Sequence, residues 1–252
     1  FIGMFAIALW DNHKEELFLI RDRLGIKPIY WKSSKGSFIF ASTLKSLTQY
    51  DSDFKIDNQA LSKYLQHGYV PSPFSIFKST YKVNPGCFVK FKLGQKPKEI
   101  TYWSLKEKVT TNFNNKFSDL NETIQYFDTL LNNSVSLRMI SDVPIGSFLS
   151  GGIDSTIVTA MMQKNSSKKI KTFSIGFEDS NFNEATDSKK IAQYLNTDHN
   201  ELYINDKDIL KLIPEIHSYY DEPFYDSSCI PTYILSKLAK KSVKVALSGD
   251  GG

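Results

Sequence analysis

The sequence predicts an α/β protein in which a doubly wound parallel sheet follows an α+β half with an antiparallel sheet. Two observations predict this arrangement. Up to about residue 92 the apolar runs are short and bounded by turn residues, which is typical of antiparallel strands. From residue 121 onwards, helical and strand-like apolar patterns alternate, and such alternation indicates a parallel sheet covered by helices.

The first half is expected to begin with a β-hairpin. Residues 3–10 are predicted to form a buried strand, residues 11–14 a turn, and residues 17–20 the returning strand. The apolar runs at 37–41 and 87–93 are expected to join the same sheet. Together these runs predict a single antiparallel sheet.

One helix and one linker are predicted next. Asp57 is a favourable N-cap, and Leu61, Tyr64 and Leu65 follow it at helical spacing. The stretch 103–119 is rich in Thr and Asn, so we expect a loop that joins two domains.

The second half contains the alternating elements. In chain order we expect a helix with the apolar stripe Ile124, Phe127, Leu130, Leu131 and Val135, a strand at 143–149, a helix at 156–163, a strand at 171–177, a helix at 184–195, a strand at 201–204, a helix at 233–240 and a strand at 243–247. Doubly wound sheets bind ligands beyond the carboxyl ends of their strands. Two glycine-rich loops, at 150–155 and 248–251, follow predicted strands and are therefore the candidate ligand loops.

Composition excludes several classes of protein. The net charge of +4 is spread along the chain, so we expect no nucleic-acid partner. No apolar stretch approaches the ~20 residues of a membrane span, so we expect no membrane association and take the cytoplasm as the default location. The two cysteines and four scattered histidines predict neither a disulfide framework nor a zinc site. Both ends fall inside apparent elements, so we interpret the chain as a fragment.

The loop Ser150 to Ser155 suits a phosphate group. Gly151 and Gly152 allow a tight turn that brings bare N–H groups against a ligand. The helix that follows directs its positive end to the same place, and the two serines add hydroxyl donors. Asp154 would repel an anion unless a divalent cation such as Mg²⁺ lies between them. The alternative is a tight strand-to-helix turn without a ligand.

These residues resemble a known family. The run 150–155 is similar to the signature of the ATP pyrophosphatases, which split ATP into AMP and pyrophosphate. The stretches around it resemble glutamine-dependent asparagine synthetases; they are Ser141 to Gly146, Phe173 to Glu178, Asp221 to Phe224 and Ser248 to Gly251. The resemblance implies an adenine nucleotide α-hydrolase-like sheet and a ligase of asparagine biosynthesis.

The first half resembles a second part of the same enzymes. Gly3 to Ala6 and Arg21 to Tyr30 are similar to the later part of a glutaminase domain with an N-terminal nucleophile. The implied domains are the end of the glutaminase-like domain at 1–102, the linker at 103–119 and the start of the synthetase domain at 120–252.

The resemblance also implies roles for individual residues. Asp250 is the implied catalytic residue, which positions or deprotonates ammonia, and Asp154 is the implied Mg²⁺ ligand. The implied ATP-binding residues are Leu149, Ser150, Gly151, Gly152, Asp154, Ser155, Ile175, Ser248 and Gly249. The implied reaction joins aspartate to AMP as an acyl-adenylate, releases pyrophosphate, and then uses glutamine or ammonia as the nitrogen donor.

Several alternatives stay open at this point. The acceptor is aspartate or another carboxylate, as in a sugar-acid amidotransferase or a β-lactam synthetase, and a third option is a non-catalytic nucleotide-binding scaffold. The stretch 221–228 either lines a substrate pocket or is an exposed acidic loop. Cys229 is interpreted as a small packed residue rather than a nucleophile. The glutaminase nucleophile is absent from this chain, so we expect the fragment alone to be inactive; the oligomeric state is open, with a homodimer as one option.

Overall fold

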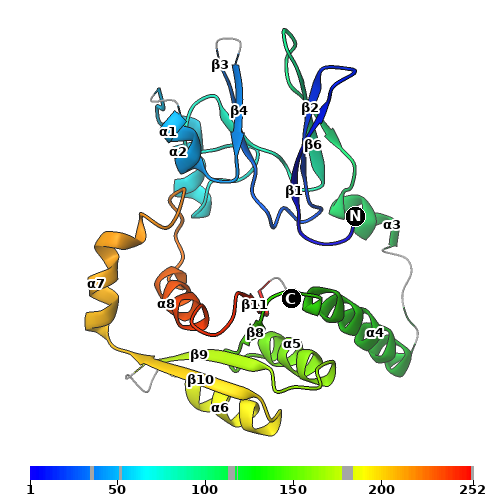
Figure 1. The fold of residues 1–252 in the computed structure, drawn as a ribbon, viewed down its shortest axis with the longest axis vertical. Helices are drawn as coiled ribbons and strands as arrows, with labels where there is room; N and C mark the ends of the chain where they lie inside the picture. The colour runs from blue at the N-terminus through cyan, green and yellow to red at the C-terminus, as the bar shows by residue number, and fades with distance from the viewer. Residues whose placement is uncertain (35–36, 51–52, 113–116, 118, 178–183, 251–252) are drawn as a thin grey trace. The chain divides into compact units, whose positions relative to one another are not determined.

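The computed structural model consists of two compact units. Residues 1–116 and 217–226 form the first unit, and residues 117–216 and 227–252 form the second. The structure describes residues 1–34, 37–50, 53–112, 117, 119–177 and 184–250. Figure 1 shows the two units as a ribbon. Each unit is described by itself below.

The first unit contains two antiparallel sheets and three helices among its described residues. The larger sheet has the order β1-β2-β6-β7 and the smaller sheet the order β4-β3-β5. The strands are β1 (Ala6–Asp11), β2 (Glu16–Arg21), β3 (Tyr30–Ser34), β4 (Ser37–Ala41), β5 (Thr80–Lys82), β6 (Cys87–Lys92) and β7 (Lys98–Thr101). The helices are α1 (Leu44–Tyr50), α2 (Asn58–His67) and α3 (Leu105–Asn112).

The predicted hairpin is confirmed, but two expectations about its sheet are wrong. β1 and β2 pair antiparallel, with Asp11 opposite Glu16. The run 37–41 belongs to the smaller sheet, because β4 pairs with β3 and not with β2. β1 is mostly exposed rather than buried, since it is an edge strand and the apolar cluster around Leu19 and Val89 covers only the central strands.

The predicted helix at Asp57 is confirmed together with its cap. The Asp57 carboxylate accepts hydrogen bonds from the N–H groups of Gln59 (2.8 Å) and Ala60 (3.3 Å). Ala60 faces the core, whereas Leu65, which we expected on the apolar face, is 76% exposed. The expected loop at 103–119 is also corrected, because α3 occupies much of it.

The second unit is a parallel sheet with the order β10-β9-β8-β11. Its strands are β8 (Ile145–Phe148), β9 (Lys171–Phe177), β10 (Asp198–Ile204) and β11 (Val245–Leu247). Its helices are α4 (Leu120–Met139), α5 (Ile153–Lys164), α6 (Ala185–Tyr194), α7 (Asp206–Ile216) and α8 (Cys229–Ala239). All the predicted elements are present, and α7 is an additional helix that the sequence did not indicate. This confirms the predicted doubly wound class.

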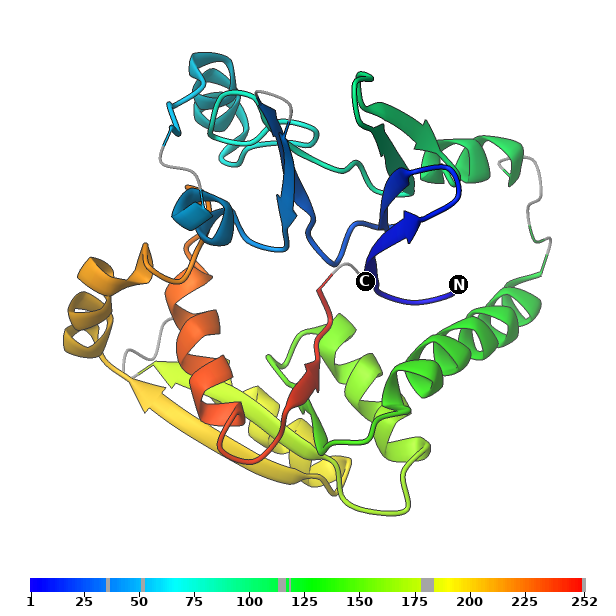
Figure 2. The same ribbon diagram turned by 45° about the horizontal axis from the view of Figure 1, so that its top comes forward.

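Helices cover both faces of this sheet. Phe173 of β9 packs with Ala239, the last residue of α8, and with Val243 of the following segment, whereas Ile145 and Leu247 pack with residues of α4 and α5. Figure 2 shows α8 and α6 on opposite faces of the sheet. Strand order reverses between β8 and β11, because β9 and β10 lie on one side of β8 and the later strand β11 lies on the other. Such a switch point is where ligands of open α/β sheets bind.

The expected apolar stripe of α4 is only partly buried. Leu131 and Val135 pack against α5 and the sheet. Ile124, Phe127 and Leu130, in the first eleven residues of the helix, are each at least 50% exposed. No helix in the described parts of the chain has the length and apolar character needed to cross a membrane.

Candidate functional site

The first glycine loop lies directly beyond β8. Leu149 is 1% exposed and its N–H donates to the carbonyl of Phe173 (3.0 Å), so the loop starts from a fixed position next to β9. Gly151 has φ of +85°, a left-handed conformation that L side chains rarely adopt. Gly152 is the N-cap of α5 and provides no side-chain cap. The first N–H groups of α5 are therefore left to a ligand or solvent.

Hydroxyl groups hold the loop in shape. The oxygens of Ser150 and Ser155 are 3.0 Å apart, and Ser155 also accepts from the N–H of Ser150 (3.2 Å). Thr156 donates to the carbonyl of Gly152 (2.7 Å). The two serine hydroxyls that we expected to bond a phosphate bond each other in this structure, and their bonds to a phosphate stay a prediction.

The second glycine loop follows β11 and lies against the start of α5. A Cβ atom at Gly249 would be 2.6 Å from the nitrogen of Ser155 and 2.9 Å from the Cβ of Asp154. Beside it, the Ser248 hydroxyl donates to the Asp250 carboxylate (2.9 Å). The Asp250 N–H in turn donates to the hydroxyl oxygen of Ser248 (3.3 Å). The structure therefore brings together the two loops that the sequence singled out.

The site fits a phosphate group accompanied by a divalent cation. Backbone N–H groups at the start of α5 and the glycines around them form a cradle that larger residues would fill. Asp154 is exposed in the first turn of α5, and within the described residues its carboxylate has no ion pair. The described residues hold no group of three or more His, Cys, Asp or Glu able to bind a metal. A Mg²⁺ ion here would thus depend on Asp154, phosphate oxygens and water.

Ile175 is less closely tied to the loops. It is half-buried in β9, opposite Leu202 of β10, and it lies two residues past Phe173, the last partner of β8. This places it at the correct end of the sheet, but nothing in the structure joins its side chain to Leu149 or Ser150. Its contact with adenosine stays a prediction.

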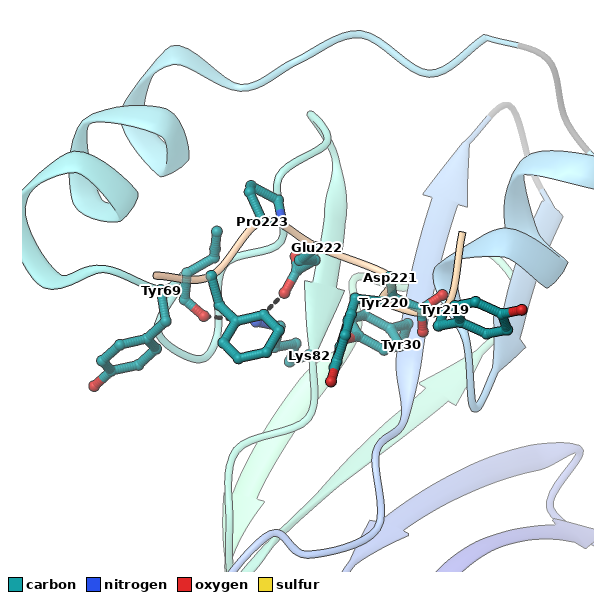
Figure 3. A pocket seen from close by; sticks show the side chains of 10 residues that line it. Tyr30, Tyr69, Lys82, Tyr219, Tyr220, Asp221, Glu222 and Pro223 are labelled. Atoms are coloured by element: carbon teal, nitrogen blue, oxygen red, sulfur yellow. Dashed lines mark hydrogen bonds and ion pairs between the residues drawn. The ribbon is translucent and has the colours of Figure 1, made fainter. Parts of the chain in front are cut away.

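A pocket lies in the first unit, and the sequence indicated only one of its segments, the start of the stretch 221–228. Its volume is ≈ 360 Å³, and Figure 3 shows its side chains. The Lys82 ammonium forms an ion pair with Glu222 and donates to the carbonyl of Val70 (2.6 Å). Glu222 also accepts from the N–H of Ile76 (2.8 Å). The residues that line it are Tyr30, Tyr69, Val70, Lys82, Tyr219, Tyr220, Asp221, Glu222, Pro223 and Phe224.

The stretch 221–228 is divided between the two units. Residues 221–226 belong to the first unit, where the N–H of Tyr225 donates to the carbonyl of Gly68 (2.6 Å), and Ser227 and Ser228 belong to the second. Burial raises the pKa of the Glu222 carboxyl, and the nearby charge of Asp221 raises it further against the opposing effect of Lys82. Sequence distance hid most of this pocket, because its residues come from four separated segments, Tyr30, residues 69–70, Lys82 and residues 219–224.

The second unit defines the chain as an α/β protein with a paired-glycine-loop cradle at the switch point of a parallel sheet. Comparison with known proteins identifies the family to which the chain belongs. The asparagine synthase family matches residues 126–252, half of the chain, and the glutamine amidotransferase domain matches residues 1–103. The chain belongs to the asparagine synthase family.

Two relatives match the chain over nearly its whole length. It is 38% identical to the putative asparagine synthetase [glutamine-hydrolyzing] 2 of Methanocaldococcus jannaschii, over 100% of this chain and 48% of that protein. It is 35% identical to the asparagine synthetase [glutamine-hydrolyzing] 1 of Bacillus subtilis, over 99% of this chain and 38% of that protein. The chain thus spans less than half the length of these relatives.

Proposed function

We propose that this chain is part of an ATP-dependent amidotransferase that makes asparagine from aspartate, with glutamine or ammonia as the nitrogen donor. The observation that carries the proposal is the contact between Gly249 and the start of α5, which joins the two glycine loops at the switch point. The names of the two relatives support the same reaction. AMP and pyrophosphate are the other products.

The proposed ATP site is built on these loops. The α5 N-terminus faces the β- and γ-phosphates, while Leu149 and Ile175 contact the adenosine and Ser248 and Gly249 close the site. Ser150, Gly151, Gly152, Asp154 and Ser155 form the pyrophosphate grip. Mg²⁺, held by Asp154, would neutralise charge on the leaving pyrophosphate.

The proposed reaction has two steps. A carboxylate oxygen of aspartate attacks the α-phosphorus of ATP, so that an acyl-adenylate forms and pyrophosphate leaves. Backbone N–H groups at the start of α5 stabilise the charge that develops on the leaving group. Ammonia then attacks the acyl carbon and AMP leaves. Asp250, oriented by the Ser248 hydroxyl, positions or deprotonates the attacking ammonia.

The proposed organisation follows the family matches. Residues 1–102 form the later part of the glutaminase domain, and residues 120–252 the first part of the synthetase domain. The partners are small molecules, the location is the cytoplasm, and a homodimer is the assembly to test.

Pyrophosphate release tests the proposal directly. A full-length protein that contains this chain is incubated with ATP, Mg²⁺ and ammonium, with and without aspartate. Aspartate-dependent pyrophosphate together with an equal amount of asparagine is the expected result. A protein that binds ATP but releases pyrophosphate only with another carboxylate, such as a sugar acid, would contradict aspartate as the acceptor. A protein that binds ATP but releases no pyrophosphate with any carboxylate would favour the non-catalytic nucleotide-binding scaffold.

A further inference from the structure

Among the described residues, one carboxylate of the pocket in the first unit, that of Asp221, forms no ion pair with a cation. Lys82 and Glu222 satisfy each other, with further bonds to the carbonyl of Val70 and the N–H of Ile76. In the part of the chain that the structure describes, the Asp221 carboxylate accepts only the N–H of Lys45, at 3.3 Å, and forms no ion pair. The lining residues therefore carry one unbalanced negative charge, and it lies at Asp221.

Aromatic rings form most of the remaining surface of the pocket. Figure 3 shows Tyr69 at one end and Tyr219 at the other, with Glu222 and Lys82 between them. As whole residues, Tyr69 and Tyr219 are 55% and 52% exposed. Aromatic faces carry a negative quadrupole that attracts cations.

Charge effects on neighbouring groups agree with this picture. Burial is the main reason that the pKa of the Tyr30 phenol is raised, and the negative charges of Glu222 and Asp221 raise it further against the opposing positive charge of Arg21. The influence of Asp221 thus reaches the buried wall of the pocket. An incoming cation would gain from the carboxylate and from the rings at the same time.

We propose that this pocket binds a small organic cation with an alkylated ammonium head group, for which Asp221 is the counter-ion and the tyrosine rings form the walls. A hard metal ion fits less well, because Ca²⁺ and Mg²⁺ require several oxygen ligands and only one carboxylate has free capacity here. Alkyl groups on the nitrogen pack favourably on aromatic rings, and a volume of ≈ 360 Å³ accommodates a molecule the size of choline. The pocket belongs to the first unit and the glycine loops to the second, so the proposal does not rest on the proposed function.

A comparison of two probes of equal shape tests the charge requirement. Choline and its neutral isostere 3,3-dimethylbutan-1-ol are titrated into the folded chain at matched ionic strength, and the tyrosine ring signals are followed by NMR. Choline should shift the signals of Tyr69 and Tyr219 in a saturable manner, and the neutral isostere should bind at least about fivefold more weakly. Equal binding of the two probes, or no saturable shift with choline, would overturn the proposal.

Two variants and a matched control locate the binding site. Asp221→Asn should weaken choline binding about fivefold or more, because it removes the counter-ion while keeping the shape of the side chain. Tyr219→Leu should weaken it by removing an exposed ring. Glu107→Gln, which removes a carboxylate from α3 away from the pocket, should bind choline as the unmodified chain does. Unchanged choline binding by both pocket variants would overturn the proposal even if choline binds elsewhere.

Discussion

A Cβ atom at Gly249 would lie 2.6 Å from the backbone nitrogen of Ser155, so only glycine fits where the loop after β11 meets the start of α5. Gly249→Ala should therefore push the two loops apart and lower the stability of the second unit by about 1–3 kcal/mol. It should also abolish detectable ATP binding. Urea unfolding and titration with a fluorescent ATP analogue measure the two effects.

The same loop offers a matched control for this substitution. A Cβ atom at Gly152 would meet only the Ser150 hydroxyl, at the ordinary distance of 3.4 Å, and Gly152 has a negative φ of −70°. Gly152→Ala should therefore change the stability by less than about 0.5 kcal/mol. Equal loss of stability in both alanine variants would contradict the close approach at Gly249.

Asp154 should make ATP binding dependent on Mg²⁺. The unmodified chain should gain affinity for ATP when Mg²⁺ is added, because the ion joins the Asp154 carboxylate to the phosphates. Asp154→Ala should lose this gain, by about tenfold or more in affinity. Titrations with and without Mg²⁺ measure it, and Asp187→Ala on the surface of α6 is the control. A variant that keeps the full Mg²⁺ effect would exclude Asp154 as the metal ligand.

Asp250 should affect the second chemical step more than the first. In a full-length protein, Asp250→Asn should leave the pyrophosphate released in the first aspartate-dependent turnover nearly unchanged and slow asparagine formation by about 10²-fold or more. The two products are quantified in the same reaction. The carboxamide can still accept the Ser248 hydroxyl bond, so the loop is expected to keep its shape. An equal loss of both products would contradict a role that is specific to ammonia.

The Lys82–Glu222 ion pair should be costly to break from one side. Its side chains are only 13% and 11% exposed, so Lys82→Met leaves the Glu222 carboxylate buried with only the N–H of Ile76. A loss of about 3–5 kcal/mol in the free energy of unfolding is expected, and Lys82→Met with Glu222→Gln should recover much of it. Lys190→Met, at an exposed pair with Asp187, should cost less than about 1 kcal/mol. Urea unfolding of the unmodified chain, Lys82→Met, Glu222→Gln, their double variant and Lys190→Met tests this, and additive effects of Lys82→Met and Glu222→Gln in the double variant would contradict the coupling.

Asp22 should make the free energy of unfolding of the first unit depend on pH. Its carboxylate accepts four backbone N–H groups, from Phe5, Leu24, Ile26 and Lys27, at 2.9–3.3 Å. Burial alone would raise its pKa, but these bonds outweigh burial and lower the pKa. The ionised group therefore stabilises the fold above pH of about 4, and this contribution is lost as the pH falls through the lowered pKa. Urea unfolding between neutral and acidic pH should show this slope, and Asp22→Asn should flatten it.

Local patterns predicted much of the fold. The N-cap at Asp57, the hairpin at 6–21 and the strand at 171–177 are each specified by residues that are adjacent or at fixed spacing. The glycine loops were located for the same reason. Patterns of this kind cannot say which sheet a strand joins, so the run 37–41 was placed in the wrong sheet. The exposure of Leu65 depends equally on tertiary contacts.

The pocket around Glu222 could not be predicted in this way. Lys82 is separated from Asp221 and Glu222 by about 140 positions, and its pairing with Glu222 depends on how the chain folds back. The string Asp221 to Phe224 suggested a role for these residues, but it gave no sign of the lysine that neutralises one of them.

The return of residues 217–226 to the first unit limits how the gene can be divided. A protein cut after residue 116 would contain Lys82, the N–H of Ile76 and the carbonyl of Gly68, but not the segment that satisfies them. It would therefore be expected to aggregate or to need the missing ten residues added as a peptide. All the strands of the first unit lie in the first half of the chain, but the unit also needs residues 217–226. Recombination or fusion at the linker at 103–119 would therefore separate residues that fold together.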